Sequence, residues 1–218
     1  MTLIAGPNFL AVALGLLGAV FGVGADRFAT RWPDHEAPFE PGRPIGWRTL
    51  LTAATGAIGL AGVGLRFSDP LPLAAFGAYV LVLIALLATD LDQRLMPNLL
   101  TWPTIVLAGL FAASGLDPLV GAEIVPAVIA AIAIPAVLFA LSIPFGEGAF
   151  GLGDVWLIVG LGLIAGAYRA FVGVVSGFLL SGVVIALLLV TRRVGRRSYL
   201  PFGPFLIAGA LWGILGPR

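Results

Sequence analysis

The sequence contains no cysteine and no lysine, and it has a single histidine. Without cysteine, neither a disulfide nor a zinc site with thiolate ligands can form. The histidine, His35, lies among acidic residues and prolines, which favours a solvated loop residue over a metal ligand. These absences predict a protein without a metal site.

Charged residues of either sign are also few. They make up 11% of the 218 residues, whereas 60% of the residues are hydrophobic, and the net charge is +1. A soluble core of this size does not need so much apolar surface, and the small net charge argues against a nucleic-acid partner. The composition therefore predicts an all-α, polytopic membrane protein.

The scarce charges divide the chain into eight apolar intervals, which predict about eight transmembrane helices. These intervals are residues 1–25, 49–65, 70–89, 95–116, 124–146, 155–168, 170–191 and 198–217. The first lacks the basic start of a signal peptide and is predicted to be a spanning helix. Four prolines in residues 26–48 predict a short irregular loop outside the membrane. We expect residues 1–218 to form a single membrane-embedded domain.

The arginines predict the orientation of this domain. Nine of the twelve basic residues fall on one side of an eight-span topology. The positive-inside rule makes that side cytoplasmic and places both termini outside. Asp90 and Asp154, which were not used in the count, both fall on the cytoplasmic side.

Asp90 closes an uncharged run of twenty residues, Pro70 to Thr89. An ionised carboxylate there resists leaving water and faces the negative end of the helix macrodipole. A charge at the membrane boundary would explain Asp92 and Arg94, but it explains Asp90 less well. We therefore looked for a chemical partner of Asp90.

The candidate partner is Asp154, in the segment Gly151-Leu152-Gly153-Asp154 at the start of another apolar run. Taken alone, this segment is typical of a helix N-terminal cap. Two carboxylates that converge can share a proton, so that one acts as a base on water and the other as an acid. That is the arrangement an aspartic peptidase needs.

These residues resemble the bacterial type IV prepilin leader peptidases, which are membrane-embedded aspartic peptidases with a Gly-x-Gly-Asp motif. The resemblance extends from Leu83 to the C-terminus. Three segments carry it in the family's order: Asp90 to Asn98 followed by Leu100, Thr101 and Pro103, then Gly151 to Asp154, then Leu200 to Phe205. Three such segments in order are a much stronger signal than any one of them.

The resemblance implies an endopeptidase at the cytoplasmic face of the bacterial inner membrane. Its substrates would be precursors of type IV pili or type II secretion, with a basic leader, a glycine and then a hydrophobic helix. It implies a catalytic pair, Asp90 and Asp154, and a supporting set, Asp92, Arg94, Pro97, Gly151 and Gly153. The implied partners are these prepilin or pseudopilin precursors and the lipid bilayer, and cleavage itself would need no cofactor or metal.

The chain departs from the family pattern at two places. Many members carry paired cysteines in the first cytoplasmic loop and methylate the new N-terminus with S-adenosylmethionine, whereas the loop 26–48 has no cysteine. We therefore predict cleavage with little or no methylation. The family also often has a lysine where this chain has Trp156, which bears on substrate contacts.

Two other functions remain open from the residues alone. A proton- or cation-coupled transporter would also use membrane-embedded aspartates and the proline-containing interval 124–146. An inert scaffold would use Asp154 as a cap and Asp90 as a boundary charge.

Overall fold

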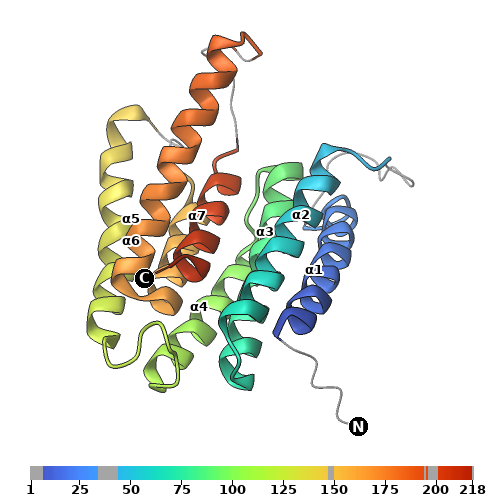
Figure 1. Cartoon of the computed structure of the whole chain (residues 1–218). Coiled ribbons are helices and arrows are strands. Elements are labelled where there is room, and N and C mark those ends of the chain that lie inside the picture. The colour runs from blue at the N-terminus through green and yellow to red at the C-terminus, as the bar shows by residue number, and fades with distance from the viewer. Residues whose placement is uncertain (1–6, 34–43, 147–149, 194, 196–200, 218) are drawn as a thin grey trace. The chain divides into compact units, whose positions relative to one another are not determined.

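The computed structural model describes residues 7–33, 44–146, 150–193, 195 and 201–217, and every regular element among them is helical. The elements are α1 (Pro7–Ala29), α2 (Trp47–Arg66), α3 (Pro70–Gln93), α4 (Asn98–Ala113), α5 (Ile124–Ser142), a 3-10 turn η1 (Ile143–Phe145), α6 (Leu152–Val190) and α7 (Gly203–Leu215) (Figure 1). The predicted all-α class is confirmed.

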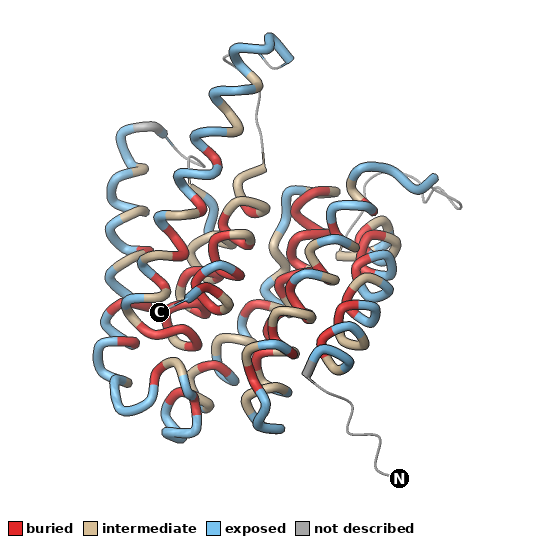
Figure 2. Tube along the Cα trace, viewed as in Figure 1, coloured by how far each residue is buried: buried red, intermediate tan, exposed pale blue. Residues whose placement is uncertain are grey.

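Five of these helices are long and apolar enough to cross a membrane, and α4 and α7 are shorter apolar helices. Large apolar side chains lie on their outward faces, where Leu16 of α1 is 65% exposed and Ile132 of α5 is 64% exposed (Figure 2). Water would penalise such faces, whereas lipid tails would cover them. The chain is therefore a multi-pass membrane protein.

The chain forms two compact units, residues 1–104 and 105–218. The first contains α1 to α3 and the start of α4, and the second contains the remaining helices. The expectation of one membrane domain stays a prediction.

In the first unit, α1 and α2 pack backbone against backbone. A Cβ atom on Gly56 would overlap the carbonyl group of Gly18, and a Cβ atom on Gly22 would overlap the backbone of Thr52. Only residues without side chains allow such an approach, which is how spanning helices gain dispersion energy in lipid. The two helices form the wall against which α3 packs.

In the second unit, α6 reverses its direction at Gly166. This residue has φ 77° and ψ 170°, a conformation that costs little only for glycine. The reversal brings a methyl of Leu161 to 3.4 Å from where a Cβ of Gly173 would lie, whereas a straight helix would separate these residues by about 18 Å. Counted as two segments, α6 gives eight α-helical segments among the described residues, whereas five helices are candidate membrane spans, so the number of eight spans stays a prediction.

Two predicted boundaries are wrong. The break between the sixth and seventh predicted spans lies at Gly166 and not beside Arg169. The side chain of Arg169 instead donates to the carbonyls of Gly213 and Gly216 at the end of α7. The predicted loop 26–48 begins later than expected, since α1 continues to Ala29. Residues 34–43, which include His35, lie outside the described residues.

The close contact of α1 and α2 predicts the effect of one added methyl group. Gly56→Ala should lower the stability of the detergent-purified protein by about 1–3 kcal/mol, because the methyl group forces the helices apart. Gly77→Ala on α3 is the matched control, since nothing lies within 4 Å of a Cβ at Gly77. Thermal unfolding measures both, and equal melting temperatures for the two variants would contradict the backbone contact.

Candidate active site

Asp90 lies in the last turn of α3 and is buried, with 7% of its surface exposed. Its main-chain carbonyl accepts a hydrogen bond from the N–H of Arg94, which adopts the left-handed conformation and ends the helix. The carbonyl of Pro97 accepts the first bonds of α4, from the N–H groups of Leu100 and Thr101. Arg94 and Pro97 thus shape the turn that follows Asp90.

A polar cluster joins the helix ends around this turn. Nη1 of Arg48, at the start of α2, lies 2.7 Å from Oδ1 of Asp92, whose side chain is only 6% exposed. The hydroxyl of Thr49 donates to the buried carboxylate of Asp26 at 2.6 Å. The C-terminal ends of α1 and α3 and the N-terminal end of α2 therefore meet at one end of the unit.

Gln93 completes the cluster. Its amide nitrogen donates to the carbonyl oxygens of Ala29 at 2.6 Å and Trp32 at 3.1 Å. These bonds connect the end of α3 to the last residue of α1 and to the segment after it. The predicted site did not include Gln93. The only signal for it in the sequence is its position between Asp92 and Arg94.

Asp154 lies in the first turn of α6, three residues after the N-terminal cap, Gly151. The predicted alternative, in which Asp154 itself is the cap, is therefore wrong in detail. A Cβ on Gly151 would lie 3.4 Å from a carboxylate oxygen of Asp154, an ordinary contact distance, so the cap lies directly beside this carboxylate. Gly153 lies within the same first turn.

The third segment of the resemblance packs beside the second. The ring of Phe202 lies 6.4 Å from that of Phe150, the residue before Gly151, and 4.9 Å from that of Phe178. The start of α7 is thus connected to the segment that leads into Asp154. The sequence placed these segments in order but did not predict their contact.

The helix ends give the two aspartates opposite surroundings. Asp90 lies at the negative end of the α3 macrodipole, which disfavours a carboxylate, whereas Asp154 lies at the positive end of α6, which favours one. Asp90 belongs to the first unit and Asp154 to the second. Their convergence stays a prediction.

A buried carboxylate that the sequence analysis did not single out is Asp117, in the loop between α4 and α5. Its Oδ1 accepts the N–H groups of Leu119 and Val120, at 2.8 and 3.3 Å. Burial raises the pKa of Asp117 to about 6, although these two bonds oppose the shift. The bonds indicate that Asp117 shapes its loop.

Among the described residues, no group of three or more His, Cys, Asp and Glu side chains could hold a metal ion.

The ion pair of Arg48 and Asp92 predicts coupled effects on stability. Asp92→Asn and Arg48→Met should each lower the melting temperature, because each leaves a partly buried charge without its counterion. The double variant should lose less than the sum of the two singles, with a coupling of about 0.5–3 kcal/mol. Additive losses in thermal unfolding would show that the pair contributes nothing.

The sequence model of the type IV leader peptidase family matches residues 77–190, a range that includes Asp90 and Asp154. No solved structure gives a significant match.

Two curated relatives are named prepilin leader peptidase/N-methyltransferase. The one from Dichelobacter nodosus is 32% identical over 170 residues, which cover 78% of this chain and 57% of the relative. The one from Burkholderia pseudomallei (strain 1026b) is 31% identical over 169 residues, which cover 76% of this chain and 54% of the relative. The chain thus spans little more than half the length of these relatives. It belongs to the type IV leader peptidase family.

Proposed function

We propose that the chain is a membrane-embedded aspartic endopeptidase that removes the basic leader of type IV pilin-like precursors. In this proposal Asp90 and Asp154 are the catalytic pair and act at the cytoplasmic face of the bacterial inner membrane. The observation that carries it is the family match, which spans both aspartates and is joined by relatives whose printed names are those of prepilin leader peptidases. The matched relatives offer no support for the transporter alternative.

The opposite helix ends support a division of roles within the pair. Asp154, at the positive end of α6, is the carboxylate that takes a proton from water as the water oxygen bonds to the scissile carbonyl carbon. Asp90, at the negative end of α3, holds the shared proton and gives it to the carbonyl oxygen. As the resulting diol collapses, Asp154 gives its proton to the amide nitrogen, Asp90 takes a proton back from a diol hydroxyl, and the carbon–nitrogen bond breaks.

Asp92, Arg94 and Pro97 support Asp90 in this proposal without taking part in proton transfer. Asp92 forms the ion pair with Arg48. Arg94 and Pro97 shape the turn after α3. Gly151 and Gly153 add no side chain at the start of α6, so in this proposal they let the substrate or another helix approach the backbone beside Asp154. Replacing Asp92 by Asn should therefore lower activity only in part.

Methyl transfer is a separate activity, which the curated relatives have in their names. The sequence has no cysteine, so a cysteine zinc motif in residues 26–48 is excluded. We propose that the chain cleaves its precursors with little or no methylation of the product, and that cleavage needs no cofactor.

The catalytic proposal predicts the activity of three variants. Asp90→Asn and Asp154→Asn should each abolish cleavage of a precursor with a basic leader, because asparagine keeps the size of aspartate but cannot exchange the proton. The double variant should be no less active than either single, since members of one catalytic unit are not additive. Cleavage by the purified protein in detergent, followed on a gel, measures all three.

The matched control is Asp69→Asn. Asp69 is an exposed aspartate at the other end of α3 and makes no side-chain capping bond. This variant should cleave at the native rate. Near-native cleavage by Asp154→Asn would return Asp154 to a structural role at the start of α6 and would overturn the pair.

A further inference from the structure

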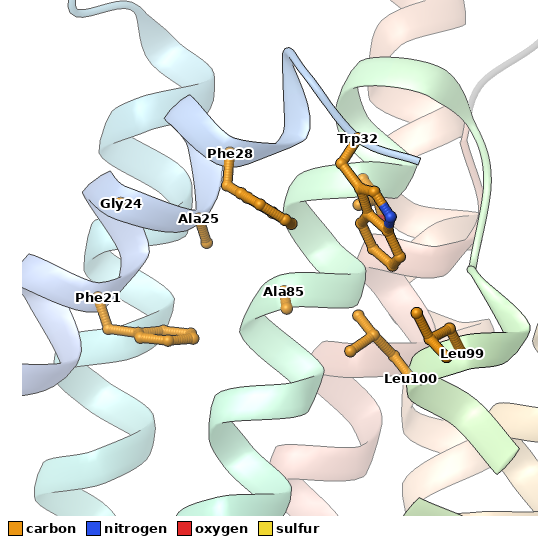
Figure 3. A pocket seen from close by; sticks show the side chains of 9 residues that line it. Phe21, Gly24, Ala25, Phe28, Trp32, Ala85, Leu99 and Leu100 are labelled. Carbon is orange, nitrogen blue, oxygen red and sulfur yellow. The ribbon is translucent and has the colours of Figure 1, made fainter. Parts of the chain in front are cut away.

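An apolar cavity of about 510 Å³ lies within the first unit, beside the end of α3 that carries Asp90. Phe21 and Phe28 project into it from α1, and the ring of Trp32 faces Leu100 of α4 (Figure 3). Ala85 lines it from α3. The volume lies within the range of about 300–1,000 Å³ that is typical of ligand pockets.

The lining selects an apolar occupant. It includes no charged side chain, and its single hydroxyl, that of Thr89, donates to the carbonyl of Leu86 within α3. The rings of Phe28 and Trp32 lie 5.5 Å apart and form one aromatic wall. A basic peptide would lose its hydration there without gaining a counterion, whereas an apolar side chain would lose only contact with water.

Helix geometry connects this cavity to Asp90. Ala85 and Thr89 are four residues apart and lie on one face of α3, and Asp90 follows Thr89 by about 100° and 1.5 Å. Gln93 is the next residue along the same face and donates to the carbonyl of Trp32. It thereby fixes the aromatic wall from the helix that carries the aspartate.

We propose that this cavity is the subsite for the apolar residue that follows the scissile bond, so that Phe28, Trp32 and Ala85 determine specificity. The inference rests on the proposed function. The charged residues at this end of the unit, among them Arg48 and Asp92, do not line the cavity, so the basic leader stays outside it. The part of the substrate that is both apolar and next to the cleaved bond is the one that fits.

The test changes the volume of the cavity and the size of the residue that fills it. Two synthetic precursors differ only in the first residue after the scissile bond, which is Phe in one and Ala in the other. Ala85→Leu should lower kcat/KM for the Phe precursor about tenfold or more, mainly through KM, because the added side chain takes its space. The Ala precursor should be cleaved within about twofold of the native rate.

Gly77→Leu is the matched control, since it adds a similar side chain on the same helix where no atom lies within 4 Å of a Cβ. It should leave both precursors unaffected. Phe28→Ala should shift the preference the other way, toward a precursor with Trp at the same position. Equal loss for both precursors in Ala85→Leu, or no loss, would overturn the subsite.

A binding measurement separates the subsite from the proposed activity. Two inactive proteins, Asp90→Asn and the double variant Asp90→Asn with Ala85→Leu, are titrated with fluorescently labelled forms of the two precursors. The double variant should bind the Phe precursor about tenfold more weakly than Asp90→Asn does. If the native protein cleaves no precursor, the proposed function fails, while size-dependent binding would still support the cavity as an apolar-residue site. A phospholipid retained by the native protein but not by Ala85→Leu in native mass spectrometry, with unchanged size selectivity, would assign the cavity to lipid and overturn the inference.

Discussion

A carboxylate buried at the end of a membrane helix is the constraint on which the first unit depends. Asp90 lies where neither the lipid nor the α3 macrodipole favours negative charge. The surrounding helix ends carry further polar groups, in the ion pair of Arg48 and Asp92 and in the bonds of Gln93 to Ala29, the last residue of α1, and to Trp32 beyond it. The backbone contact of α1 and α2 at Gly18 and Gly56 brings those helix ends near enough to form the cluster.

The second unit solves the opposite problem. Asp154 lies at a helix start, where the free N–H groups favour a carboxylate, so less support is needed. What this end requires is a fixed path for the chain into α6, and the aromatic contacts of Phe202 with Phe150 and Phe178 provide it. The reversal at Gly166 lets both halves of α6 pack within the same unit, with α7 close to its second half through Gly173 and Gly209.

Much of the helix map could be predicted because apolar runs and charges report directly on lipid and water. The starts of α3 at Pro70 and of α5 at Ile124 were predicted to the residue, since an acidic residue precedes each apolar interval, Asp69 in one case and Glu123 in the other. The continuation of α1 to Ala29 was missed because Asp26 looks like a loop residue until Thr49, from a distant part of the sequence, satisfies it. The reversal in α6 was predicted three residues too late, at Arg169, because one glycine among many carries no local signal for a positive φ angle whereas a charge does.

The candidate site, like the helix map, could be predicted only in part. Its aspartates and glycines could be named from motifs, whereas Gln93 and the cavity beside Thr89 depend on contacts between residues some sixty positions apart in the sequence. Such contacts arise from packing, which a periodicity argument does not reach. The family match covers residues 77–190 only, so α1, α2 and α7 have to be understood from their own contacts.

We propose that Asp90 and Asp154 converge, and a disulfide cross-link between the two positions would report this directly. Because the chain has no native cysteine, Asp90→Cys with Asp154→Cys creates the only two thiols. If the two positions converge, we expect rapid disulfide formation under mild oxidation, since a disulfide requires the two Cα atoms to lie within about 7 Å of each other. Asp69→Cys with Asp154→Cys should not cross-link, since Asp69 lies about 32 Å along α3 from Asp90. Cross-linking of the second pair, or failure of the first pair while both thiols react with maleimide, would contradict the account.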